Sequence, residues 1–98
     1  MSMIDEYLQL QSNLEIKYGK NSIVVYQVGG FYEMYSINTK YKQVGDIKKI
    51  SSILNFQATR KNKSVEHSIN NPYMCGFPIH SLTKHLNTLI NNNYTVEL

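Results

Sequence analysis

Phe31 and Glu33 stand two positions apart, directly after two glycines at positions 29 and 30. If the chain runs extended here, side chains at alternate positions share a face, so Phe31, Glu33 and Tyr35 would point the same way. Gly29 and Gly30 leave the backbone free to turn and add no side-chain bulk. This arrangement suits pressing a ring against a flat ligand such as a nucleobase while a carboxylate oxygen accepts a hydrogen bond from it.

The same residues also have an ordinary structural interpretation, in which Phe31 and Tyr35 fill a core and Glu33 is a surface charge. The exposure of Phe31 separates the alternatives. An exposed ring beside the glycines, rimmed by lysines, favours nucleic acid. A buried ring favours a small protein-interaction domain that docks a partner through an aromatic face, an interface that eight tyrosines would suit.

Positive charge is concentrated in the middle of the chain. Residues 37–64 contain seven basic side chains and one acidic one, a balance of +6, within a chain whose net charge is +3. A local basic region is the usual electrostatic footprint of a polyanionic partner, although a lysine-rich solvated face has the same composition.

Other chemistries are poorly supported. His67, His80, His85 and Cys75 lack the close spacing of metal ligands, and the apolar neighbours of Cys75 predict an inert buried thiol. The sequence has no phosphate-binding glycine loop and no paired carboxylates. We therefore expect no catalytic residues, no metal and no cofactor in this chain, and no enzymatic activity of its own.

The composition describes one small domain of 98 residues, of which 42% are hydrophobic. A single cysteine excludes an internal disulfide and fits a reducing, intracellular compartment. No apolar run approaches the ~20 residues of a membrane span, and the N-terminus lacks a signal-peptide pattern. We expect no membrane partner.

The hydrophobic periodicity predicts an α+β domain, with a mixed sheet of about five short strands flanked by about three helices. Predicted helices begin at the caps Ser2, Asp46, and His80 or Ser81; the first ends at Gly19 and the second at Asn55. The apolar face of the third helix is predicted to comprise Leu82, Leu86, Leu89 and Ile90. Strands are predicted at 22–28, 31–37, 56–59, 73–77 and 94–98.

The remaining segments are predicted to be irregular. Residues 38–45 read as a loop and residues 60–71 as an exposed, mobile loop. Pro78 cannot donate to a strand ladder, so the strand before it should be short or at an edge. The chain ends in or just after a strand, which suggests a fragment of a longer protein.

The run from Gly29 to Tyr35 resembles the signature of the N-terminal mismatch-recognition domain of MutS-type DNA mismatch repair proteins. The resemblance extends over nearly the whole chain. It includes the opening Tyr7-Leu8-Gln9-Leu10, Thr59-Arg60, the block from Pro72 to His80, and the closing Asn93-Tyr94-Thr95-Val96.

The resemblance implies roles for particular residues. Phe31 would wedge into the minor groove and stack on a mispaired or unpaired base, and Glu33 would accept a hydrogen bond from that base. Arg60, Lys61 and Lys63 would lie in a loop near the DNA backbone. The implied partners are duplex DNA with mismatches or small loops, other domains, and a second subunit. ATP and Mg²⁺ would bind an ATPase domain outside these residues.

Three departures from the family pattern stand out. Position 30 is Gly, where members often have Asp or Lys. The stretch 36–45 is several residues longer than the bacterial pattern. Together with residues 71–78, it is more similar to viral and organellar branches. The connector, lever, clamp and ATPase domains of the family are missing, so residues 1–98 would form the mismatch-recognition domain alone and bind DNA weakly.

Overall fold

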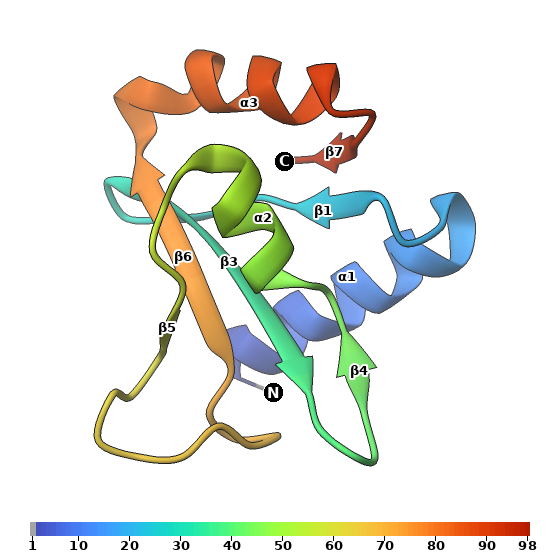
Figure 1. Cartoon of the computed structure of the whole chain (residues 1–98), viewed down its shortest axis with the longest axis vertical. Helices are drawn as coiled ribbons and strands as arrows, with labels where there is room; N and C mark the ends of the chain where they lie inside the picture. The colour runs from blue at the N-terminus through green and yellow to red at the C-terminus, as the bar shows by residue number, and fades with distance from the viewer. Residues whose placement is uncertain (1) are drawn as a thin grey trace.

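The computed structural model describes residues 2–98, and over this range the chain forms three α-helices and seven short strands (Figure 1). The helices are α1 (Met3–Tyr18), α2 (Ile47–Leu54) and α3 (Leu82–Asn91), with a 3-10 turn, η1 (Ile79–Ser81), before α3. The strands are β1 (Ser22–Val24), β2 (Tyr26–Val28), β3 (Phe31–Asn38), β4 (Gln43–Val44), β5 (Thr59–Arg60), β6 (Tyr73–Pro78) and β7 (Thr95–Glu97). The predicted α+β class is confirmed.

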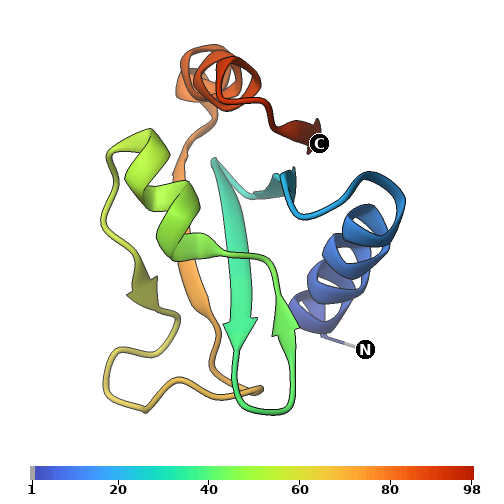
Figure 2. The ribbon, with the colours of Figure 1, turned by 45° about the vertical axis from the view of Figure 1, so that its right-hand side comes forward.

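Five strands form an antiparallel sheet in the order β2-β3-β6-β5, with β4 paired to the far end of β3. The other two strands, β1 and β7, form a separate parallel pair. Helices α1 and α2 lie on opposite sides of the main sheet, and α3 lies at one end of the molecule beside β7 (Figure 2). The predicted mixed sheet is therefore two sheets, one antiparallel and one parallel.

The strand predicted over residues 22–28 is divided in two at Val25. Ile23 and Val24 lie in β1, which pairs with β7, whereas β2 turns to pair with β3. Val25 is buried, and its backbone N–H donates to the Glu97 carbonyl at 2.8 Å. All of these residues have strand propensity, so the local pattern could not reveal that the chain passes from one sheet to another.

Helix α1 begins and ends where the sequence predicts. The Ser2 side chain accepts a hydrogen bond from the Asp5 backbone N–H at 3.1 Å, which caps the first turn. Gly19 follows the last turn with a φ of 90°, a region that favours glycine.

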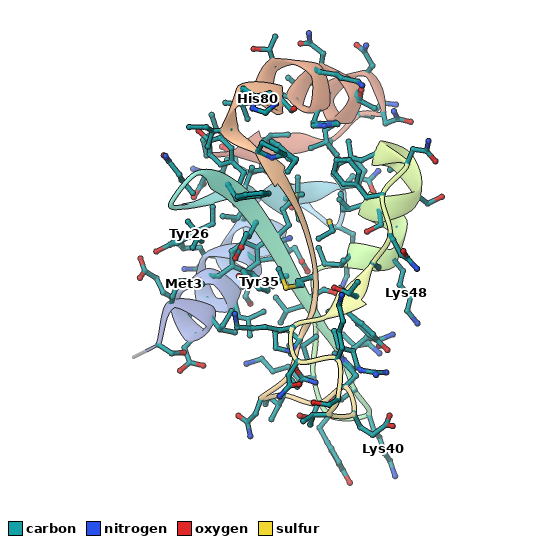
Figure 3. All side chains as sticks on the ribbon, turned by 90° about the vertical axis from the view of Figure 1, so that its left-hand side faces the viewer. Met3, Tyr26, Tyr35, Lys40, Lys48 and His80 are labelled. Atoms are coloured by element: carbon teal, nitrogen blue, oxygen red, sulfur yellow. The ribbon has the colours of Figure 1, made fainter. Side chains whose placement is uncertain are left out.

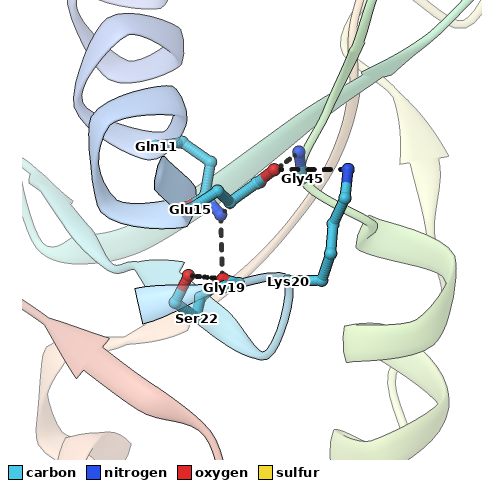
Figure 4. A network of polar contacts seen from close by, with 6 residues as sticks. All are labelled: Gln11, Glu15, Gly19, Lys20, Ser22 and Gly45. Atoms are coloured by element: carbon cyan, nitrogen blue, oxygen red, sulfur yellow. Dashed lines mark hydrogen bonds and ion pairs between the residues drawn. The ribbon is translucent and has the colours of Figure 1, made fainter. Parts of the chain in front are cut away.

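The C-terminal part of α1 is tied to the rest of the fold by the polar network of Figure 4. Glu15 accepts hydrogen bonds from Gln11 at 2.8 Å and from the Gly45 backbone N–H at 2.7 Å, and its carboxylate lies 3.7 Å from the Lys20 ammonium. Because Gly45 directly precedes the cap of α2, this network fixes α1 relative to the start of α2.

The caps of α2 are also confirmed. The Asp46 side chain accepts from the Lys49 N–H, and Asn55 ends the helix in the left-handed conformation. Helix α3 follows Ser81, but its buried face differs from the prediction. His85 and Leu89 are buried, while Ile90 is exposed, because the helix packs against Phe77 through His85.

Two predictions for the strands and loops were wrong. Residues 38–45 contain β4, which folds back on β3 as a hairpin. The predicted strand at 56–59 forms later, at Thr59–Arg60. Strand β6, predicted to be short or at an edge, has six residues and lies between β3 and β5. Pro78 is tolerated because β5 pairs only with Tyr73 and Met74, so the Pro78 end of β6 has β3 as its one paired neighbour among the described strands.

The two faces of the sheet have different surroundings. Met34, Cys75 and Phe77 are buried on the side of α2 and α3. Tyr35 is buried on the side of α1, where it packs edge-on against Tyr7 with 5.2 Å between ring centroids. Helix α1 lies mainly along β1, so the part of this face formed by the start of β3 and the end of β6 is left open.

Candidate functional site

The turn between β2 and β3 places the start of β3 at the surface. Gly29 has a φ of 59°, a left-handed value that other residues rarely adopt. Gly30 has no such value, and a Cβ at either glycine would have no atom within 4 Å. The Gly30 carbonyl accepts from the Ile79 N–H at 3.0 Å, which joins the turn to η1. The backbone conformation of the turn favours glycine at position 29, whereas position 30 has room for a side chain.

Phe31 and Glu33 lie on the open face of the sheet, as the alternation predicts. The Phe31 ring is 50% exposed, and Glu33 is half-buried. Both line a shallow groove of about 340 Å³, whose other lining residues are Gln57, Thr59, Met74, Cys75 and Gly76. An aromatic ring and a carboxylate therefore border one concave surface that is open to a ligand.

Gly76 of β6 is the residue directly opposite Glu33 in the strand register. A Cβ at this position would lie 2.6 Å from the Tyr32 carbonyl oxygen, closer than real contacts allow, and 3.4 Å from the Glu33 Cγ. The close approach of β3 and β6 therefore depends on glycine here, and the missing side chain leaves the groove open beside Glu33.

The Glu33 carboxylate is held in place by Tyr35, the next residue on the same face. The Tyr35 hydroxyl donates a short hydrogen bond to Glu33 Oε1. Burial, and secondly this hydrogen bond, raise the pKa of the Tyr35 phenol well above its usual range, so the hydroxyl stays protonated and can donate. Within residues 2–98, Oε2 has no hydrogen-bond partner. One oxygen is thus fixed, and the other can accept a hydrogen bond from a ligand.

The Tyr35 ring is itself fixed by its neighbours. Tyr7 packs edge-on against it, and the Tyr7 hydroxyl donates to the Val24 carbonyl at 2.7 Å. Figure 3 shows Tyr35 and Tyr26 on the side of the sheet that faces α1. The carboxylate is therefore positioned by a side chain from the core rather than by a flexible surface group.

The structure separates the three predicted basic residues. The Lys61 ammonium lies 5.7 Å from the centre of the Tyr35 ring, on the same face as Glu33. Arg60 is part of β5 and pairs with Tyr73, so the alternation of the strand directs it to the opposite face. There Arg60 and Lys63 line another shallow groove, and the Arg60 guanidinium donates to the Lys63 carbonyl. Among the described residues no lysine lines the Phe31 groove, so the expected rim of lysines is not found there, and Lys61 lies instead against Tyr35 on the same face.

Sequence reasoning missed two members of the site. Tyr35 was placed on the correct face, but its spacing from Glu33 did not by itself indicate a hydrogen bond. Gly76 carried a usable signal, because a glycine inside a strand often marks a close backbone approach. Its partner could not be identified without the register of β3 and β6.

The described part of the chain holds no metal cluster and no membrane-spanning helix. Residues 2–98 contain no group of three or more His, Cys, Asp or Glu side chains arranged to hold a metal ion. Cys75 is buried as predicted, and burial raises the pKa of its thiol, which disfavours the reactive thiolate. None of the helices between residues 2 and 98 is long and apolar enough to span a membrane.

Comparison with known proteins identifies the class. The family model for MutS domain I matches residues 2–98. The chain is 30% identical over 96 residues to the DNA mismatch repair protein MutS of Staphylococcus haemolyticus strain JCSC1435 and to that of Staphylococcus aureus strain JH9. In both cases the match covers 98% of this chain but 9% of the relative.

The chain belongs to the MutS family of DNA mismatch repair proteins, within which it corresponds to domain I and not to the ATPase domain. The resemblance of the glycine-aromatic-carboxylate run is thereby confirmed at the level of the family.

Proposed function

We propose that residues 1–98 form a DNA-binding module that senses mispaired or unpaired bases in duplex DNA. One observation carries the proposal: Phe31 is half-exposed on an open sheet face, where it shares a groove with a carboxylate that has one free oxygen. A buried Phe31 would have favoured the protein-interaction alternative. The family match and the basic middle of the chain point to the same partner.

In this proposal the Phe31 ring enters the minor groove and stacks on the aberrant base. An apolar wedge unstacks a base step and kinks the duplex at a cost of a few kcal/mol. A mispaired step is easier to deform, so the wedge penalises it less than paired DNA. Gly29 and Gly30 allow the backbone beside the wedge to approach the DNA closely.

Glu33 supplies the polar part of the recognition. Its free oxygen accepts a hydrogen bond from the edge of the displaced base, which offsets the repulsion between a carboxylate and the phosphates. Lys61 lies on this face and is placed to attract the backbone, whereas Arg60 and Lys63 reach DNA only if it extends around the edge of β5.

The module would act within a longer protein. The matched relatives are about ten times longer, and each is named as a DNA mismatch repair protein. We propose that the parent protein is an intracellular ATPase of a reducing compartment, and that it binds ATP and Mg²⁺ in another domain. We further propose that it grips mismatched DNA together with a second subunit, and that it belongs to a viral or organellar branch.

The proposal is tested by titrating the chain into fluorescently labelled duplexes that are fully paired, mismatched, or contain one unpaired base. At low salt the wild-type chain should bind the aberrant duplexes more tightly. Phe31→Ala should remove this preference, because base–aromatic stacking is worth roughly 1–3 kcal/mol. Glu33→Gln should reduce the preference for those mismatches whose displaced base offers a donor.

Tyr18→Ala is the matched control, since Tyr18 is a half-exposed aromatic residue at the end of α1, outside the groove. It should bind as the wild type does. The wedge assignment is wrong if Phe31→Ala keeps the wild-type preference while remaining folded.

A further inference from the structure

The hairpin between β3 and β4 ends in a rigid basic tip, which we define as Thr39, Lys40, Tyr41 and Lys42. The Thr39 hydroxyl oxygen accepts from the backbone N–H groups of Tyr41 at 3.3 Å and Lys42 at 3.1 Å, and the Thr39 N–H donates to the Lys42 carbonyl at 2.9 Å. These bonds close the turn on itself. The tip is therefore a hydrogen-bonded turn rather than a flexible loop.

Tyr41 is presented to solvent at this tip. Its side chain is 90% exposed, the highest value among the large hydrophobic residues described. Lys40 and Lys42 flank it and are also exposed, and the Lys40 ammonium lies 5.8 Å from the centre of the Tyr41 ring. The Tyr41 ring is not part of the hydrophobic core formed by the described residues, and two positively charged side chains lie beside it in the sequence.

A second basic segment, residues 61–71, is hydrogen-bonded to the end of β3 next to the tip. His67 Nε2 accepts from the Asn38 backbone N–H at 3.0 Å, and its ring stacks on Tyr73 with 3.9 Å between centroids. Asn71 is buried and bonds three carbonyls of the segment, those of Asn62, Val65 and Glu66. Residues 60–71 were predicted to form an exposed, mobile loop; Arg60 lies in β5, and these bonds organise the largely exposed segment 61–71. It carries Lys61 and Lys63 to the same end of the molecule.

Few acidic groups oppose these charges. Asp5 lines a groove together with Lys42, and Glu66 is the acidic residue of the 61–71 segment. Within residues 2–98 the one ion pair joins Lys20 and Glu15, so none of the four lysines at this end is neutralised by a salt bridge. Figure 3 shows Lys40 at the end of the molecule opposite His80.

The tip is coupled rigidly to the Phe31 groove. Phe31 begins β3 and the tip directly follows its last residue, Asn38, and this continuous strand is paired along its length with β6, β2 or β4. At ~3.3 Å per residue, the seven steps of the strand separate its ends by about 23 Å. This is roughly seven base-pair steps of duplex, so one DNA molecule can reach both places.

We propose that the β3–β4 tip is a second DNA contact, which binds the phosphate backbone of the same duplex irrespective of its sequence. Lys40 and Lys42 attract the phosphates, and the Tyr41 hydroxyl donates to a phosphate oxygen, a common mode of backbone contact. The inference rests on duplex DNA being the partner, as proposed above. It adds an anchor that sets the position of the duplex on the domain.

The test measures affinity for paired and mismatched duplexes over a range of salt concentrations. In Lys40→Gln/Lys42→Gln, the slope of log K against log salt should become shallower by about 1 for each lysine removed. Affinity for both duplexes should fall by the same factor, about threefold or more at low salt, so the mismatch preference is unchanged. Tyr41→Phe should lower both affinities by a smaller, equal factor.

Lys17→Gln/Lys84→Gln is the matched control, because it removes the same charge from exposed positions on α1 and α3. The proposal is overturned if the tip variant keeps the wild-type affinity and salt slope, if the control reproduces its effect, or if the wild-type chain binds no duplex. A loss of mismatch preference with intact affinity would also contradict it. The two proposals fail separately, because Phe31→Ala tests preference and the tip variant tests affinity common to both duplexes.

Discussion

The contact between Tyr35 and Glu33 combines two requirements in one residue. The Tyr35 ring belongs to the core, where it packs on Tyr7, while its hydroxyl donates to the carboxylate of Glu33, which lines the groove. A carboxylate on an open sheet face would otherwise rotate freely and pay rotamer entropy on binding a ligand. Fixing one of its oxygens removes part of that loss. We therefore expect Tyr35 to be a positioning residue, which acts on DNA only through Glu33.

Tyr35→Phe tests this expectation, because it keeps the ring and removes only the hydroxyl. The mismatch preference should fall, while the free energy of unfolding should change by about 1 kcal/mol, the usual value of one hydrogen bond. Added to Glu33→Gln, the same change should have little further effect, since the two residues act as a unit. The measurement is a double-mutant cycle. The wild type, the two single variants and the double variant are each titrated by fluorescence with paired and mismatched duplexes.

Tyr32→Phe is the control, since Tyr32 lies on the other face of β3. It should leave the preference intact. Full additivity of Tyr35→Phe and Glu33→Gln would show that Tyr35 does not act through the carboxylate.

At the level of secondary structure, the pairing of β3 with β6 decides the shape of the site. The register puts Gly76 against Glu33, and the contact between the strands is too close for any side chain at that position. The groove is therefore a property of two strands that are far apart in the sequence. A substitution in β6 should therefore alter the structure at the start of β3.

Gly76→Ala should destabilise the domain by about 2 kcal/mol or more, because its Cβ would force the Tyr32 backbone away. Gly30→Ala should change the free energy of unfolding by less than ~1 kcal/mol, because that position is open and has an ordinary φ. Urea denaturation of the two variants compares them directly. If the two variants were equally stable, β3 and β6 would be able to move apart without a loss in the free energy of unfolding.

The same level of organisation explains what the sequence could predict. Helix boundaries were predictable because their caps are local: Ser2, Asp46 and Asn55 each act within one turn of their helix. The shared face of Phe31 and Glu33 was predictable because strand alternation is local as well. The sheet switch at Val25, the internal position of β6 and the separation of Arg60 from Lys61 depend on pairing between distant segments, which local patterns do not encode.

At the level of the whole molecule, helix α3 packs on the rest of the domain through an ionisable side chain, that of His85. His85 is buried between Phe56 and Phe77, with 4.7 Å between its ring centre and each of theirs. Burial, and secondly Lys84, lower the pKa of His85 below its usual value of 6.5. The folded state therefore holds this histidine neutral, whereas the unfolded chain takes up a proton as the pH falls below about 6.5.

The domain should consequently lose stability between pH 7 and pH 5, because protons bind the unfolded state preferentially over that range. Thermal unfolding at the two pH values measures the loss. His85→Gln should make it smaller, since glutamine does not titrate, and His80→Gln at an exposed position should leave it as in the wild type. A wild-type Tm that is equal at both pH values, or a loss unaffected by His85→Gln, would contradict the role of His85.

The parallel pair of β1 and β7 has a consequence for how the domain folds. Ser22 pairs with Thr95, so these strands join only after nearly the whole chain is available, and closing so long a loop is slow. During synthesis on a ribosome, α1 and the β2–β3 hairpin emerge early. Ile23 and Val24 of β1 stay unpaired until β7 has been synthesised. Until β7 arrives, the apolar edge of β1 is open to wrong pairings. Pairing of β7 with β1 is thus the step that closes this part of the domain and covers the open edge.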